Sequence, residues 1–176
     1  MSRLVVNNTV LSNFAGVGRL DMLREVLGSF CVPTQVYSEV LTGIAVGYAF
    51  LTLVRDQVLD TSAERWIFVI ELKANELALY NRLLATLGKG EAACLAIAKS
   101  RGWGLLTDDK KARKIAEQES VRLSGTLGVL RLGVKRGCFS LSEADEVLKA
   151  MIEKGYRSPF RSIGQLLEDQ EGQESQ

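Results

Sequence analysis

The sequence of 176 residues contains no histidine, and this absence excludes several kinds of active site. Ser-His-Asp triads, Cys-His pairs, histidine general bases and imidazole-ligated zinc sites all need the missing side chain. Any chemistry must therefore use carboxylates, amides, hydroxyls, thiols, Lys or Arg. These groups favour Mg²⁺ or Mn²⁺, which prefer oxygen ligands, over zinc.

Cysteines are few and long apolar runs are missing. Cys31, Cys94 and Cys138 are odd in number and form no CxxC motif, which predicts buried small hydrophobic residues in a reducing cytosol. The longest uncharged run, residues 40–54, is shorter than the roughly 18 to 20 residues that span a bilayer, so we expect a buried helix pair there. The first apolar run is too short for a secretory signal. We therefore expect a cytoplasmic protein without membrane contact.

The composition that remains indicates one globular domain. Hydrophobic residues make up 47% of the chain and charged residues 24%, which is ordinary for such proteins. The 22 Lys and Arg nearly balance the 21 Asp and Glu, but bases concentrate in residues 101–136 and acids in residues 140–176. We predict a single domain over residues 1–167 and a disordered acidic tail over residues 168–176.

Short apolar segments alternate with helical patterns along the chain. The five predicted strands are residues 4–6, 30–32, 66–70, 104–107 and 121–123. Apolar residues at helical spacing lie between them, in residues 10–27, 34–41, 74–87, 91–100 and 110–119, and continue in 127–136 and 142–154. This alternation predicts an α/β domain, with a central parallel β-sheet flanked by helices on both faces.

Oxygen-bearing side chains follow two of the predicted strands. Asn7 and Asn8 follow the first strand, and Asp108 and Asp109 follow the fourth. In open parallel sheets, functional groups gather at the carboxyl ends of the strands, so these side chains are candidates for one site. The alternative for one of the two aspartates is N-capping of the basic helix that follows.

Two further acids lie in helical segments with few other polar residues. Glu39 belongs to one such segment, and Glu91 begins another in which the next residues are all apolar or small. A carboxylate directed into a core is costly unless it is paired or binds a cation. The alternatives are an exposed helix residue for Glu39 and a first-turn acid favoured by the helix dipole for Glu91.

Six segments together resemble the PIN-domain nuclease family, in particular the single-domain prokaryotic branch related to the VapC-type toxins of toxin–antitoxin pairs. They are residues 5–15, 18–23, 32–40, 87–92, 105–113 and 125–130, in the order and spacing of that family. The resemblance implies a PIN-like, three-layer α/β/α fold. It also implies an endoribonuclease that binds one or two Mg²⁺ or Mn²⁺ ions and hydrolyses RNA with a metal-activated water.

The family's site residues can be placed on this sequence. The catalytic and metal positions fall on Asn7, Glu39, Glu91 and Asp109, with Asp108 as an adjacent metal candidate. Thr9 and Thr107 are expected to support the site through hydrogen bonds. The resemblance further implies a homodimer and an antitoxin protein as partner.

Position 7 departs from the family pattern, because an asparagine stands where the family has an aspartate. Asn8 would take the place if the register shifted by one residue. A neutral amide oxygen can bind Mg²⁺, but the missing charge weakens metal affinity and water activation, so we expect weakened or lost activity. Asn7 is either an engineered inactivating change, which the retention of every other acid favours, or a natural variant.

The segment after the aspartates is basic. Lys110, Lys111, Arg113 and Lys114 could contact RNA phosphates, or they could form a solvated helix face. Two other functions stay open. One is a non-catalytic PIN-like module that binds RNA or protein. The other is a nucleotide-binding protein that uses residues 88–90, which the lack of a GxxxxGK[ST] or GxGxxG motif disfavours.

Overall fold

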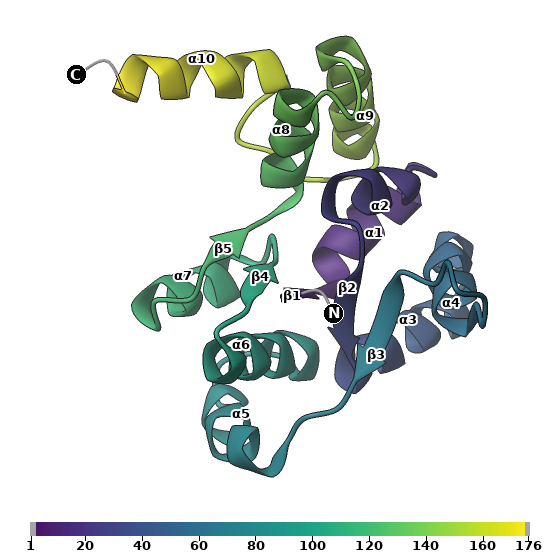
Figure 1. Ribbon diagram of the computed structural model, residues 1–176, viewed down its shortest axis with the longest axis vertical. Helices are drawn as coiled ribbons and strands as arrows, with labels where there is room; N and C mark the ends of the chain where they lie inside the picture. The colour runs from purple at the N-terminus through teal and green to yellow at the C-terminus, as the bar shows by residue number, and fades with distance from the viewer. Residues whose placement is uncertain (1–2, 175–176) are drawn as a thin grey trace.

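The computed structural model of the protein describes residues 3–174 and contains one parallel β-sheet (Figure 1). Its strands are β1 (Leu4–Val6), β2 (Phe30–Pro33), β3 (Ile67–Ile70), β4 (Gly104–Leu106) and β5 (Leu123–Ser124). They pair in the order β3-β2-β1-β4-β5, and every neighbouring pair is parallel. The predicted α/β class and parallel sheet are confirmed.

The central strands are apolar and buried because helices cover both faces of the sheet. Val5, Val6, Cys31 and Val32 are at most 1% exposed. The last strand begins two residues later than predicted, at Leu123. The carbonyl of the preceding residue nevertheless accepts a hydrogen bond from the Leu105 N–H at 2.8 Å, so strand-like pairing begins before the assigned strand.

The helices divide into layers according to which strands they connect. Between β1 and β3 lie α1 (Asn8–Gly16), α2 (Asp21–Leu27), α3 (Thr34–Ala45), the 3₁₀ turn η1 (Ala49–Leu51) and α4 (Thr52–Leu59). Between β3 and β5 lie η2 (Ala74–Glu76), α5 (Leu77–Leu83), α6 (Lys89–Arg101) and α7 (Lys110–Gln118). The chain ends with α8 (Thr126–Arg136), α9 (Leu141–Glu153) and α10 (Ile163–Glu174).

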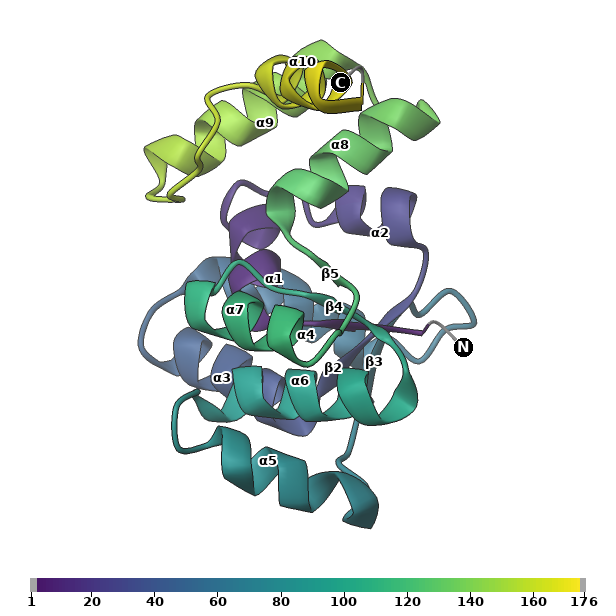
Figure 2. The ribbon, with the colours of Figure 1, turned by 90° about the vertical axis from the view of Figure 1, so that its left-hand side faces the viewer.

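The two connecting groups run in opposite directions across the sheet, so right-handed crossovers place them on opposite faces. Figure 2 shows α5 and α6 on one side of the sheet and α2 and α8 on the other. Helix α6 is buried between the sheet and α5, and residues 92–98 are at most 1% exposed. This explains why its sequence is apolar all round rather than along one stripe.

The predicted helix pair over residues 40–54 exists as the end of α3 and the start of α4, and the expected burial holds for Val40, Leu51 and Val54 but not for the turn between the helices. Val46 is 70% exposed, Tyr48 57% and Leu41 42%. The chain turns at Gly47, whose φ of +107° is strained for any residue with a Cβ, and this turn lies at the surface. Val46 and Tyr48 border a groove described below.

The C-terminal segment also differs from expectation. The disordered tail predicted for residues 168–176 is helical up to Glu174, as the continuation of α10, and residues 175–176 lie outside the described part. Glu and Gln are good helix formers, and Ile163, Leu166 and Leu167 anchor the start of the helix in the core.

The predicted burial of the cysteines is confirmed for Cys31 and Cys94, whereas Cys138 is partly exposed. All three thiols are free. Among the described residues, none of the helices combines the length and the apolar character needed to cross a bilayer.

Candidate active site

The site lies where the connections of the sheet diverge. The chain leaves β1 toward β2 on one side, while β4 pairs with β1 on the other, and such switch points leave a crevice at the carboxyl ends of the strands. Asn7 follows β1, and Thr107 follows β4. The Asn7 N–H donates to the Leu106 carbonyl at 2.9 Å, so the two strand ends are held in register.

Asn7 is fully buried and its amide has a defined orientation. Its Oδ1 accepts a hydrogen bond from the Asn8 N–H at 2.8 Å, which caps helix α1. The Nδ2 group therefore points the other way, and donates to Thr107 Oγ1 at 3.1 Å and to Glu91 Oε1 at 3.4 Å. Asn7 presents hydrogen-bond donors, rather than an oxygen, to the neighbouring acid.

Thr107 links Asn7 to the turn that begins α7. Thr107 is only 1% exposed, and its hydroxyl oxygen also accepts a hydrogen bond from the Asp109 N–H at 3.2 Å. Asp109 in turn caps α7, since its Oδ1 accepts from the Ala112 N–H at 2.8 Å. Thr107 thus connects Asn7 to Asp109 through hydrogen bonds, and α7 engages one Asp109 oxygen; the metal-binding role of Asp109 stays a prediction.

The two helix acids meet at the start of α6. Glu39 Oε1 accepts from the Gly90 N–H at 2.9 Å, and Glu91 is the next residue of that helix. Burial and the negative charge of Glu91 raise the pKa of Glu39, against the opposing effect of the Gly90 N–H. Beneath them, burial and the charges of Glu39 and Glu91 raise the pKa of Cys94 well above its usual value.

Two glycines make room for these carboxylates. A Cβ on Gly90 would lie 2.5 Å from Glu39 Oε1, and a Cβ on Gly88 would lie 2.5 Å from Glu91 Oε2. The nucleotide-binding alternative would place a phosphate at these glycines, residues 88–90. Carboxylates occupy this helix start, and their negative charge opposes a phosphate group there.

Asp108 faces a different set of partners. Its Oδ1 accepts from the Thr126 N–H at 3.0 Å, and its Oδ2 accepts from Thr126 Oγ1 at 2.6 Å and from Asn13 Nδ2 at 3.0 Å. Burial and the negative charge of Asp108, which also accepts a hydrogen bond from the phenol, raise the pKa of Tyr156. Asp108 therefore joins α1, α8 and the segment after α9, a role that the sequence did not indicate.

The turn between β4 and α7 is held from both sides. Thr9 Oγ1 accepts from the Asp108 N–H at 3.1 Å, and its supporting role in the site stays a prediction. Arg113 donates to the carbonyls of Thr107 and Ser124, at 2.9 and 3.2 Å, so its guanidinium ties β4 to β5. The other three predicted phosphate-contacting side chains, Lys110, Lys111 and Lys114, are exposed on α7.

Comparison with known proteins agrees with this geometry. A family model described as a PIN domain matches residues 3–171. The chain belongs to the PIN-domain family. PIN domains are generally nucleases that use divalent metals. Searches of the curated proteins and of the solved structures return no match to the chain.

The side chains of this PIN domain do not, as arranged, fit a tightly bound divalent metal. Within residues 3–174 there is no group of three or more Asp, Glu, Cys or His side chains that could hold a metal ion. Asn7 also turns its NH₂ group toward Glu91, whereas a metal ligand must offer an oxygen lone pair. The hydrogen bond from the Asn8 N–H holds the Asn7 oxygen at the start of α1, and Asn7 as a metal ligand stays a prediction.

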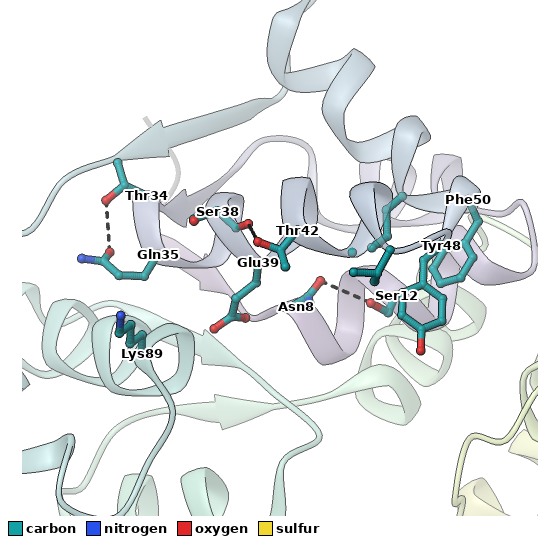
Figure 3. A pocket seen from close by; sticks show the side chains of 13 residues that line it. Asn8, Ser12, Thr34, Gln35, Ser38, Glu39, Thr42, Tyr48, Phe50 and Lys89 are labelled. Carbon is teal, nitrogen blue, oxygen red and sulfur yellow. Dashed lines mark hydrogen bonds between the residues drawn. The ribbon is translucent and has the colours of Figure 1, made fainter.

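A groove of about 890 Å³ runs past the PIN-domain acids, between α1, α3, η1 and the start of α6 (Figure 3). Glu39 points into its middle, Lys89 lies toward one end, and Tyr48 and Phe50 lie at the other. Its remaining lining combines the neutral polar residues Asn8, Ser12, Thr34, Gln35, Ser38 and Thr42 with Gly43, Val46 and Leu51.

Two further hollows continue from the aromatic end of this groove. The first has a volume of about 180 Å³ and shares Ser12 and Phe50 with the groove. Tyr156 belongs both to that hollow and to a cleft of about 510 Å³ lined by Lys110 and Arg157, among others. Shared lining residues thus connect the acids to a basic cleft.

Proposed function

We propose that this PIN-domain protein acts on single-stranded RNA as a metal-dependent endoribonuclease whose cleavage is weakened or lost because residue 7 is asparagine. The observation that carries the proposal is the position of the Asn7 amide, which donates to Glu91 at 3.4 Å at the point where β1 and β4 end. Glu39, Glu91 and Asp109 supply the remaining acids of a nuclease-type site.

An aspartate at position 7 would change the character of the site. It would place a third negative charge beside Glu91 and Glu39, in a position without exposure to solvent. Like charges held this close need a cation between them. With Asn7, the NH₂ group provides part of that compensation, so the demand for Mg²⁺ or Mn²⁺ falls.

The test is RNA cleavage by the unchanged protein and by Asn7→Asp, with Mn²⁺ or Mg²⁺ and with a chelator. We expect Asn7→Asp to cleave single-stranded RNA at least tenfold faster than the unchanged protein, and only with metal. Asn7→Asp combined with Glu91→Gln should lose that gain. If neither the unchanged protein nor Asn7→Asp cleaves RNA under any metal condition, the nuclease proposal fails. Equal rates for both would refute the assigned effect of Asn7.

A second candidate function is a non-catalytic RNA-binding PIN module. The favouring observation is that the Asn7 amide satisfies both Thr107 and Glu91 without a cation. RNA binding in chelator by both proteins, with no cleavage by either, would select this alternative over the nuclease.

The biological setting follows as a proposal from the family. We propose a cytoplasmic toxin that forms a homodimer, pairs with an antitoxin and contacts RNA phosphates through Lys110, Lys111 and Lys114. Expression of Asn7→Asp should arrest growth, and co-expression of the neighbouring small gene should relieve the arrest. Absence of arrest from an Asn7→Asp protein that cleaves RNA in vitro would remove the toxin role.

A further inference from the structure

The groove beside Glu39 ends in two aromatic rings. The centroids of Tyr48 and Phe50 are 5.9 Å apart, with the ring planes tilted by 54°. Tyr48 is 57% exposed, while Phe50 is partly buried behind it (Figure 3). A large ring left open at a groove is a surface on which a flat ligand can stack.

The walls beside the rings carry hydrogen-bonding groups without charge. Helix α3 contributes Gln35, Ser38 and Thr42, and helix α1 contributes Asn8 and Ser12. Among the residues that line the groove, charge is found only on Glu39 and Lys89. A base has a flat face to stack and polar edges to pair with amides and hydroxyls, so this lining suits a base better than a phosphate.

The structure thus assigns a nucleobase subsite to Tyr48 and Phe50: we propose that one base of a single-stranded RNA stacks there while its backbone passes Glu39. The inference rests on the proposed action on RNA and names where that RNA is held. Glu39 lines the same groove, so a strand seated on the rings reaches this acid without leaving the groove.

The path beyond the rings supports a nucleic acid over a protein segment. Phe50 borders the adjoining hollow with Lys154, and Tyr156 connects that hollow to the cleft lined by Lys110 and Arg157. Neutral stacking and pairing groups at one end, followed by lysines and an arginine, match the alternation of bases and phosphates in one strand. A peptide offers no such regular alternation of flat rings and negative charges.

The test measures RNA binding in chelator, where cleavage cannot interfere. A single-stranded oligonucleotide carrying one 2-aminopurine reports stacking, because its fluorescence is quenched on contact with a ring. We expect Tyr48→Ala to weaken binding by about tenfold, in line with the value of one stacked base, and to remove the protein-dependent quenching. Tyr48→Phe should keep both.

Leu77→Ala is the matched control, since Leu77 is 45% exposed on α5, outside the groove. It should leave affinity and quenching unchanged. A second control replaces the 2-aminopurine nucleotide by an abasic one, which should bind the unchanged protein as weakly as the intact RNA binds Tyr48→Ala.

Each result points one way. Unchanged affinity and quenching in Tyr48→Ala would overturn the subsite and leave the proposed action on RNA standing. No binding of RNA by the unchanged protein would overturn both. Dissociation of a dimer by Tyr48→Ala, with RNA binding intact, would show that the rings form an interface between copies and would also overturn the subsite.

Discussion

Replacing Asn7 by aspartate should destabilise the protein in chelator and make its stability depend on divalent metal. The side chain is fully buried, and its Nδ2 lies 3.4 Å from Glu91 Oε1 and 3.1 Å from Thr107 Oγ1. A carboxylate of the same shape turns the first contact from attraction to repulsion. The second contact survives, since the Thr107 hydroxyl can donate to a carboxylate oxygen.

The size of the effect follows from this geometry. Two unit charges 3.4 Å apart repel by about 5 kcal/mol at an effective dielectric constant of about 20. Small movements of Glu91, which is partly exposed, relieve part of this repulsion. We therefore expect the free energy of unfolding at neutral pH to fall by about 2 to 4 kcal/mol. A cation at 100 times its dissociation constant should return about 2.7 kcal/mol.

Urea denaturation of both proteins, with chelator and with Mn²⁺, measures this directly. Asn8→Asp is the matched control, because it adds the same charge one residue later, at the first position of α1, where an acid is favourable. It should cause little loss and no response to Mn²⁺. If Asn7→Asp is as stable as the unchanged protein in chelator, or if Mn²⁺ stabilises both variants equally, the assignment of position 7 to the acid cluster is refuted.

Three further predictions concern the two ends of helix α6. Glu76→Gln should cost about 3 kcal/mol of stability in urea denaturation, because Glu76 is buried and accepts from Arg101 at 2.6 and 2.9 Å. Burial alone would raise the pKa of Glu76, but the hydrogen bonds and charge of Arg101 lower it overall. The ion pair therefore stabilises the fold above pH 4.5, the ordinary pKa, and this stabilisation is lost as the pH falls further. In an acid titration, Glu76→Gln should lose correspondingly less unfolding free energy than the unchanged protein. Gly90→Ala should displace the Glu39 carboxylate and lower the free energy of unfolding by about 1 to 3 kcal/mol. The control Gly164→Ala should not destabilise the protein, because its Cβ would have no neighbour closer than 3.7 Å. Equal effects of the two substitutions would contradict the steric argument.

The architecture was predictable because buried segments have apolar sequence patterns that can be recognised locally. Strands buried on both faces are continuous apolar runs, and all five were found within two residues of their positions. The surroundings of Glu39 and Glu91 were equally informative, since acids among apolar or small residues need partners. The position of the site at the strand ends then follows from the parallel topology.

The partners of individual polar atoms were not predictable, because residues distant in the sequence supply them. Asp108 and Asp109 are adjacent and identical, yet Asp108 binds Thr126 and Asn13 while Asp109 caps α7. Successive residues leaving a strand point to opposite sides, so one of the two aspartates had to turn away from the site. Which one depends on α1 and α8, 95 and 18 residues away in the sequence.

Hydrogen-bond donors of the protein partly compensate the charges of the three acids near position 7. Each remaining acid has a donor within the protein: Glu39 has the Gly90 N–H, Glu91 has the Asn7 amide, and Asp109 has the Ala112 N–H. Compared with the aspartate of the family pattern, Asn7 carries no negative charge and offers an N–H donor to Glu91. We therefore expect asparagine there to lower the electrostatic cost of keeping Glu39 and Glu91 together and, under the proposed function, to reduce the demand for the cation that cleavage requires.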